Sequence, residues 1–178
     1  MFLAVTNSAR EALIKEGVDP RKIRVIPMGV DLEKFKAKTY NLKAKKLILF
    51  VGRLVKEKGI YDLIEAVSKI KNRDDWELLI VGDGPERESL KSKVQSAKLE
   101  NKVKIVLNVT YSKMPGIYRD ADIFVLPSVS TPNWQEQFGM VLVEAMASGC
   151  AVITTRGSPE EVVGNVGVVV PERDPMVL

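Results

Sequence analysis

The chain has 178 residues, of which 46% are hydrophobic and 28% charged, with a net charge of +4 and a pI near 9.1. This composition is that of a soluble globular domain and excludes a disordered chain. The lack of histidine excludes a Ser-His-Asp triad and most zinc sites, and the single cysteine, Cys150, excludes an internal disulfide. A lone cysteine is typical of a reducing compartment, so we expect a cytoplasmic protein, with a peripheral membrane association left open for the full-length protein.

No apolar run reaches the ~20 residues that a membrane span requires, so we expect no transmembrane segment. The N-terminal run Met1–Val5 lacks the basic flank and cleavage site of a signal peptide and predicts a strand. The densest basic run, Lys36–Lys46 with five lysines, is typical of a solvated loop. Because the other basic residues are scattered and not interleaved with aromatic residues, we expect no nucleic-acid partner.

In chain order, strand and helix patterns alternate. Ser8 and Glu11 form a capping-box pattern ahead of a helix that should end at Gly17. Apolar residues recur at helical spacing over 60–70 and again over 141–146. The remaining apolar runs predict strands at Ile23–Pro27, Leu47–Val51, Glu77–Val81, Val103–Leu107, Ile123–Leu126, Val152–Thr154 and Val166–Val170.

Most of these runs lack polar–apolar alternation, as strands buried on both faces of a parallel sheet do. The sequence therefore predicts an α/β fold with a doubly wound, Rossmann-like parallel sheet, as one domain over residues 1–178. Ligands of such folds bind at the carboxyl ends of the strands, so a site is expected in the loops that follow them.

The loop after Leu47–Val51 places the cations Arg53 and Lys58 between Gly52 and Gly59, at the carboxyl end of a strand. A guanidinium beside an ammonium suits phosphate oxygens, although a solvated turn would have the same composition.

The loop after Glu77–Val81 contains Gly82 and Gly84, which would let a ligand approach the backbone. It is not a dinucleotide fingerprint, because Arg87 stands at the third glycine position. A tight turn without function explains the two glycines equally well.

The segment 136–149 is the most informative part of the sequence. A helix should begin near Phe138 and stop at Gly149. Its first turn would offer free N–H groups and a positive dipole end to a phosphate, and Gly139 would allow the ligand to come close.

Two glutamates frame this helix start. Glu136 precedes the helix, and Glu144 lies between two apolar residues, where a lone charge needs a reason. Glu144 should lie roughly 9 Å along the axis from the start, a separation that suits two carboxylates gripping two sugars joined by a diphosphate. The alternative is that Glu136 stabilises the helix dipole and Glu144 is solvated.

Asp120 and Asp122 have the Asp-x-Asp form with which some enzymes hold a divalent metal. They precede the strand Ile123–Leu126, at its amino end, whereas ligands of this fold bind at the carboxyl ends. We therefore expect no metal site.

Together these motifs resemble the C-terminal domain of the group 1 (family 4) glycosyltransferases, over about Val5 to Pro171. The resemblance rests on their order and spacing: Gly52-Arg53 with Lys58-Gly59, then Gly82-Asp83-Gly84-Pro85, then Glu136 and Glu144 around Phe138-Gly139, with 25–31 and 121–128 in support. It implies a retaining, metal-independent enzyme of the GT-B fold, in which two Rossmann-like domains enclose the active site.

By this resemblance, the chain is the half of the enzyme that binds the nucleotide-sugar donor. The donor would be a hexose linked to UDP, GDP or ADP, and the hexose would be transferred to an unknown acceptor. The N-terminal acceptor-binding domain and the closing C-terminal helices would be absent, and no cofactor is implied. Three expected catalytic residues follow: Arg53 and Lys58 on the diphosphate, and Glu136 on the transferred sugar. Glu144 would hold the ribose, and the other expected donor-binding residues are Gly52, Gly82, Gly84, Val109 near the base, and Phe138, Gly139, Met140 and Val141 at the helix entry.

The sequence departs from the family pattern in three places. Asn108 stands where a glycine is frequent, the stretch Val129–Gln135 is long and includes Trp134, and a usual glycine pair appears only as Gly157. Other functions stay open: a stand-alone nucleotide or nucleotide-sugar binding module without catalysis, a sugar epimerase or phosphorylase on the same fold, and a nucleic-acid module. An epimerase normally needs histidines, which this chain lacks, and a phosphorylase needs a pyridoxal phosphate site that the sequence does not show.

Overall fold

The computed structural model of the chain describes residues 1–37 and 44–178, so part of the lysine-rich run lies outside the described residues. The strands are β1 (Phe2–Ala4), β2 (Ile23–Val25), β3 (Lys46–Val51), β4 (Trp76–Val81), β5 (Val103–Val106), β6 (Ile123–Leu126), β7 (Ala151–Thr155) and β8 (Val168–Val170). The helices are α1 (Asn7–Lys15), α2 (Ile60–Lys69), α3 (Arg87–Ser96), α4 (Met114–Asp120), α5 (Met140–Ala147) and α6 (Ser158–Val163), with short 3-10 turns η1 (Pro20–Lys22), η2 (Lys56–Lys58) and η3 (Tyr111–Lys113).

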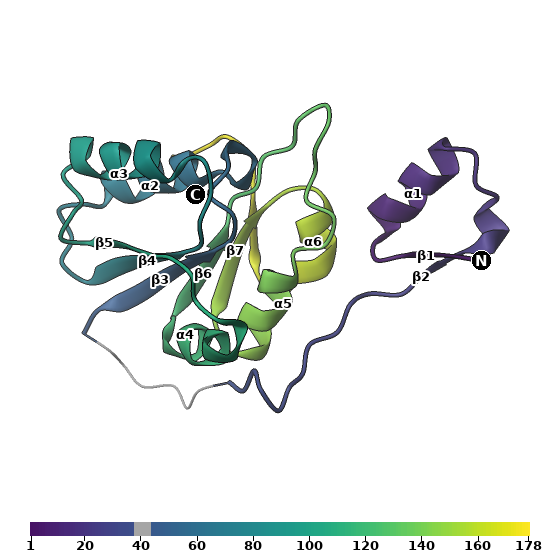
Figure 1. Cartoon of the computed structure of the whole chain (residues 1–178), viewed down its shortest axis with the longest axis horizontal. Coiled ribbons are helices and arrows are strands. Elements are labelled where there is room, and N and C mark those ends of the chain that lie inside the picture. The colour runs from purple at the N-terminus through teal and green to yellow at the C-terminus, as the bar shows by residue number, and fades with distance from the viewer. Residues whose placement is uncertain (38–43) are drawn as a thin grey trace.

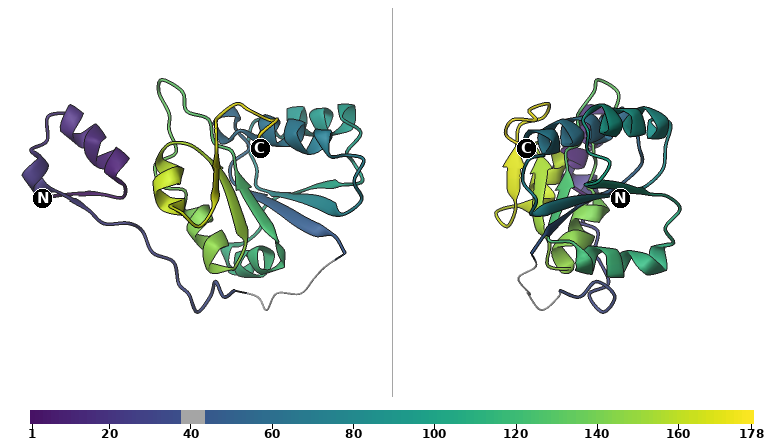
Figure 2. Two further views of the ribbon diagram at one scale, coloured as in Figure 1. Left: turned by 180° about the vertical axis from the view of Figure 1, so that it is seen from behind. Right: turned by 90° about the vertical axis from the view of Figure 1, so that its left-hand side faces the viewer.

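Six of the strands form one parallel sheet in the order β5-β4-β3-β6-β7-β8. The chain adds strands outward from β3 in one direction and from β6 in the other, so the order reverses between β3 and β6. Helices α2 and α3 cover one face of the sheet, and α4 and α5 cover the other (Figures 1 and 2). The predicted α/β fold with a doubly wound parallel sheet is confirmed, and each predicted apolar run contains a strand.

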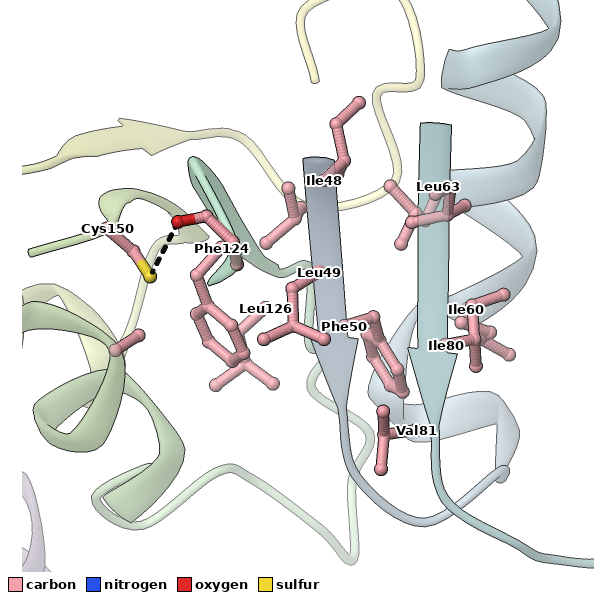
Figure 3. Close-up of a cluster of buried hydrophobic side chains, with 14 of the residues drawn as sticks. Ile48, Leu49, Phe50, Ile60, Leu63, Ile80, Val81, Phe124, Leu126 and Cys150 are labelled. Atoms are coloured by element: carbon pink, nitrogen blue, oxygen red, sulfur yellow. Dashed lines mark hydrogen bonds between the residues drawn. The ribbon is translucent and has the colours of Figure 1, made fainter. Parts of the chain in front are cut away.

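The core lies between the sheet and its helices. Leu49 and Phe50 of β3 are fully buried, as are Ile60 of α2 and Ile80 of β4. Figure 3 shows Phe50 beside Ile80 and Ile60, whereas Leu49 points toward Phe124 of β6. Burial of such a side chain contributes roughly 1.5–3 kcal/mol relative to exposure. The core therefore fixes the central strands, whose carboxyl ends carry the predicted site. Cys150 is buried beside it, and its Sγ donates to the carbonyl of Tyr118 over 3.2 Å.

Strands β1 and β2 pair with each other in a separate parallel sheet, and α1 lies between them in the chain. This N-terminal unit lies beside α6 in Figure 1, at the end of a long connection to β3. The Asn7 amide donates to both carboxylate oxygens of Glu161 in α6, over 2.8 and 2.9 Å. Thr6 Oγ1 donates to the carbonyl of Gln137 over 3.3 Å, so the unit touches the segment that leads into α5.

The predicted capping box at Ser8 and Glu11 is wrong. Helix α1 begins one residue earlier than Ser8, and Thr6 is its cap, with Oγ1 accepting from the amide of Ala9 over 3.1 Å. Ser8 therefore lies inside the first turn. The expected end is confirmed, since α1 stops at Lys15 and Gly17 has a φ of +91°. Within the described residues, no helix is long and apolar enough to cross a membrane.

Candidate functional site

The site is built where the strand order reverses, from the loops after β3 and β6. Gly59 begins α2 with a φ of +65°, and a Cβ added there would fall 1.7 Å from the carbonyl oxygen of Pro127, directly after β6. Only glycine permits this backbone contact. The contact brings Lys58 up to the segment 128–139 that joins β6 to α5.

Lys58 and Glu136 form an ion pair at this junction, with side chains only 15% and 13% exposed. Ser128 Oγ donates to Glu136 Oε2 over 3.3 Å, and Lys58 Nζ lies 5.3 Å from the ring centroid of Trp134. The sequence prediction brought Lys58 and Glu136 to one site, and the structure brings them into contact. In this state each charge is neutralised by the other.

Arg53 lies at the mouth of a neighbouring hollow of about 320 Å³. Its guanidinium is exposed and makes no ion pair with any part of the chain that the structure describes. A Cβ added to Gly52 would lie 3.9 Å from Lys58 Cδ, so the Lys58 stem runs beside this hollow. The lining comes from the ends of three adjacent strands and from the first residue of α4: Val51, Gly52, Arg53, Val81, Gly82, Asp83, Asn108, Val109 and Met114.

Gly82 and Gly84 serve a contact within the protein. A Cβ at Gly82 would fall 1.8 Å from the carbonyl oxygen of Gly52, and one at Gly84 would fall 2.4 Å from that of Leu54. The two loops are joined by a hydrogen bond from Leu54 N to the Asp83 carbonyl, 2.9 Å long. The glycines are therefore required to bring these loops together, whether or not a ligand also approaches them.

Asn108 stands just before Val109 with a φ of +54°. Asparagine is one of the few residues besides glycine that adopt this left-handed backbone readily. Asn108 therefore adopts a backbone conformation that a glycine at this position would also allow. Val109 remains half-buried at the edge of the hollow, where the resemblance puts the base.

Helix α5 begins at Met140, two residues later than the predicted start near Phe138, because Gly139 adopts a φ of +77°. The ring of Phe138 is buried in the core at 4% exposure, so only its backbone is placed to meet a ligand. No side chain among the described residues caps the helix. The amides of Met140 and Val141 are therefore available to an anion at the positive end of α5.

Glu144 lies in α5 four residues after its start, so the predicted separation of roughly 9 Å becomes roughly 6 Å. The alternative of a solvated glutamate is wrong, because Glu144 is 5% exposed. The Tyr111 hydroxyl donates to Glu144 Oε1 over 2.9 Å, and this bond raises the pKa of Tyr111. Burial, and then the charge of Glu144, raise the pKa of Tyr118 above its usual range, so both phenols stay protonated.

The Asp-x-Asp pair lies at the amino end of β6, as predicted. Asp122 is buried, and its Oδ2 accepts from the amide of Leu47 over 2.9 Å while its own amide donates to the Leu47 carbonyl. This carboxylate joins the amino ends of β3 and β6. Across residues 1–37 and 44–178, no group of three or more acidic, histidine or cysteine side chains could hold a metal ion.

Sequence reasoning did not single out Tyr111 or Ser128 as parts of the site. Ser128 is the last residue of the family segment 121–128, which was a usable signal. Tyr111 lies 33 residues before Glu144, in a polar turn with no pattern of its own, and carried no such signal.

Comparison with known proteins identifies the family of the chain. The family model of the glycosyl transferases group 1 matches residues 31–178. The chain is 33% identical to a putative colanic acid biosynthesis glycosyltransferase, WcaL, of Salmonella typhimurium, and equally to an amylovoran biosynthesis glycosyltransferase, AmsK, of Erwinia amylovora. Each match covers 100% of this chain and 45% of the relative, so the chain spans somewhat less than half the length of these curated relatives.

Among solved structures, a glycosyltransferase of Rickettsia africae matches 98% of the chain with a TM-score of 0.85 and 28% identity, over 50% of its own length. A C-terminal domain of a group 1 glycosyltransferase of Francisella tularensis matches 84% of the chain, over 83% of its own length, with a TM-score of 0.69 and 27% identity. HepE of Anabaena, solved with UDP and glucose, shares the fold with a TM-score of 0.84 at 23% identity, over 98% of this chain and 50% of its own. The family model, the full-length matches and the fold agree, and the chain belongs to the group 1 glycosyltransferases of the GT-B fold.

Proposed function

We propose that this chain is the donor-binding domain of a retaining, metal-independent glycosyltransferase that takes a hexose from a nucleotide sugar. The observation that carries the proposal is the meeting of four features at one edge of the sheet. These are the guanidinium of Arg53, which pairs with no acidic group among the described residues, the Lys58–Glu136 pair, the start of α5, which no described side chain caps, and the buried carboxylate of Glu144.

This arrangement suits a sugar diphosphate. Cleavage of the sugar–phosphate bond leaves a diphosphate whose negative charge grows in the transition state. Arg53, Lys58 and the amides at the start of α5 would stabilise that charge from fixed positions, and for this reason we propose that no metal ion takes part. Retention of the sugar's configuration belongs to the same proposal and is drawn from the family resemblance.

The other residues divide the rest of the donor. Glu136 would contact hydroxyls of the transferred sugar, Glu144 would hold the ribose, and the base would lie in the hollow beside Val109. HepE, whose likeness to this chain is one of fold, was solved with UDP and glucose. That a related fold holds such ligands supports a nucleotide sugar here. We also propose a cytoplasmic location, on the single cysteine.

Calorimetric titration of the chain with UDP, GDP and ADP, and then with their hexose derivatives, tests the proposal. We expect one nucleotide series to bind with a stoichiometry of one, and EDTA to leave the affinity unchanged. A strict requirement for magnesium or manganese would contradict the metal-independent site, and failure of all three series to bind would contradict the function. Binding without transfer in any longer form of the protein would favour the alternative of a stand-alone binding module.

A further inference from the structure

The buried carboxylate of Glu144 is held by a residue that the family resemblance does not assign. Tyr111 lies in η3, just after the loop that follows β5, and its hydroxyl donates to Glu144 Oε1 over 2.9 Å. A carboxylate that is 5% exposed needs a hydrogen-bond donor, because its burial is otherwise costly. Tyr111 provides that donor from a different element.

The ring of Tyr111 is held by Phe35, which follows β2 in the chain. Tyr111 is 61% exposed, so little of it is fixed by the core. Phe35 is 1% exposed and lies against Tyr111 on one side, with ring centroids 6.0 Å apart, and against Tyr118 on the other, with centroids 5.8 Å apart. The Phe35 amide donates to the Asp31 carbonyl over 3.0 Å, and this bond holds Phe35 in a turn.

We propose that Tyr111 is a positioning residue that fixes the Glu144 carboxylate for the vicinal diol of a ribose, with Phe35 holding the Tyr111 ring. This inference rests on the proposed function and deepens it. A carboxylate oxygen accepts two hydrogen bonds, so the single bond from Tyr111 to Oε1 leaves the carboxylate with acceptor positions for the two hydroxyls of the diol.

The benefit is preorganisation. An unbound glutamate must lose rotamer freedom when it grips a ligand, and a side chain already fixed by a neighbour avoids that loss. The two bonds are not in competition, because the tyrosine hydroxyl and the diol use different lone pairs. Tyr111 therefore strengthens ribose binding without touching the ribose.

The test is a thermodynamic cycle that removes the Tyr111 hydroxyl from the protein and the two ribose hydroxyls from the ligand, singly and together. Parent chain and Tyr111→Phe are titrated by calorimetry with whichever of UDP, GDP and ADP binds, and with its 2′,3′-dideoxy analogue. We expect Tyr111→Phe to weaken binding of the ribonucleotide about 5- to 10-fold, the effect of one hydrogen bond. The dideoxy analogue, which has no diol for Glu144 to hold, should bind parent and variant equally.

Two further variants separate positioning from general damage. Phe35→Leu keeps an apolar side chain at this position but loses the ring contact with Tyr111. It should weaken binding of the ribonucleotide and leave binding of the dideoxy analogue unchanged. Tyr61→Phe, which removes a hydroxyl on α2 that donates to Glu86 at the start of α3, should change neither affinity.

The outcomes are distinguishable. An equal loss for both nucleotides would mean that Tyr111 contacts the base or supports the fold, and no loss for either would mean that it does not act on Glu144; both overturn the inference and leave the proposed function standing. If the parent chain binds none of the three nucleotides, the proposed function and this inference are overturned together.

Discussion

At the scale of single residues, Arg53 differs from the other cations of the site because it has no counter-ion in the described part of the chain. Its exposed guanidinium contributes little to the fold. If it grips the diphosphate, Arg53→Ala should weaken binding of the nucleoside diphosphate by roughly 1.5–3 kcal/mol, the scale of a charge-assisted hydrogen bond. Calorimetry measures the affinity, and thermal unfolding should show an unchanged Tm. Arg73→Ala is the matched control, since Arg73 pairs with Asp75 next to the amino end of β4 and should leave the affinity unchanged. Equal affinity in Arg53→Ala and parent would refute the assignment.

Glu136 poses the opposite case, because it neutralises Lys58 in the structure described here. A diphosphate would compete with Glu136 for the same ammonium group. Glu136→Gln removes the competing charge but also the contact that we propose between Glu136 and the sugar. We expect the nucleoside diphosphate to bind as tightly as before or up to about 10-fold more tightly, which is the lower end of what a charge-assisted hydrogen bond contributes. The additional affinity of the nucleotide sugar over the diphosphate should be lost.

The same two calorimetric titrations on Glu77→Gln serve as the control, since Glu77 pairs with Lys45 on the surface at the amino ends of β3 and β4, away from the site. A fall in diphosphate affinity for Glu136→Gln alone would contradict the competition. It would indicate that Glu136 supports the phosphate site by orienting Lys58.

Sequence reasoning reached the site residues to different degrees. Glu144 could be found because its apolar neighbours in the chain make a charge there conspicuous. Tyr111 could not, because its role depends on how η3 is set against α5, and that follows from tertiary packing. The start of α5 was misplaced by two residues because the left-handed conformation of Gly139 is a property of the folded chain.

At the scale of elements, the loop 129–135 is anchored to the end of the chain. The amide and hydroxyl of Ser130 donate to the Glu172 carboxylate over 2.9 and 2.8 Å, and Arg173 donates to the Ser130 carbonyl over 3.3 Å. A hydrogen bond of 2.8 Å from Thr131 N to the Trp134 carbonyl closes the turn that sets the indole over Lys58. Figure 1 shows this loop rising between β6 and α5. The residues after β8 therefore hold the loop that carries Trp134.

Glu172→Ala should release this loop. We expect a loss of about 1–2 kcal/mol in the free energy of unfolding, because the lost bonds are charge-assisted but only partly buried. The acrylamide quenching of Trp134 should rise, and the buried Trp76 supplies a constant background. The exposed helix residue Glu160 gives the control variant Glu160→Ala, which should leave quenching unchanged. Unaltered quenching in Glu172→Ala would mean that the turn holds Trp134 without its anchor.

At the scale of the whole molecule, the strands could be predicted because parallel strands buried on both faces appear as apolar runs. The division into two sheets could not. Strand β2 is a short apolar run like the others, and only its pairing with β1 separates it from the six-stranded sheet. Strand partners are chosen by tertiary contacts, which the pattern of single residues does not contain.

The last prediction concerns the relation of this chain to a full enzyme. Curated relatives are more than twice as long, and each match covers only 45% of them. A donor held by this chain alone would remain partly in water, which weakens each electrostatic contact, and no acceptor would be held near the reacting carbon of the sugar. We therefore expect the 178-residue chain to bind the nucleotide sugar and to release no transferred sugar in a mass-spectrometric assay with a panel of acceptors. A longer chain that adds the remaining length of the relatives should transfer the hexose.

In that longer chain, Glu144→Ala should chiefly raise KM for the donor through the ribose, whereas Glu136→Ala should lower kcat, since its proposed partner is the sugar that moves. Transfer by the 178-residue chain alone would show that the site needs no second half, and the opposite kinetic pattern for the two glutamates would exchange their roles.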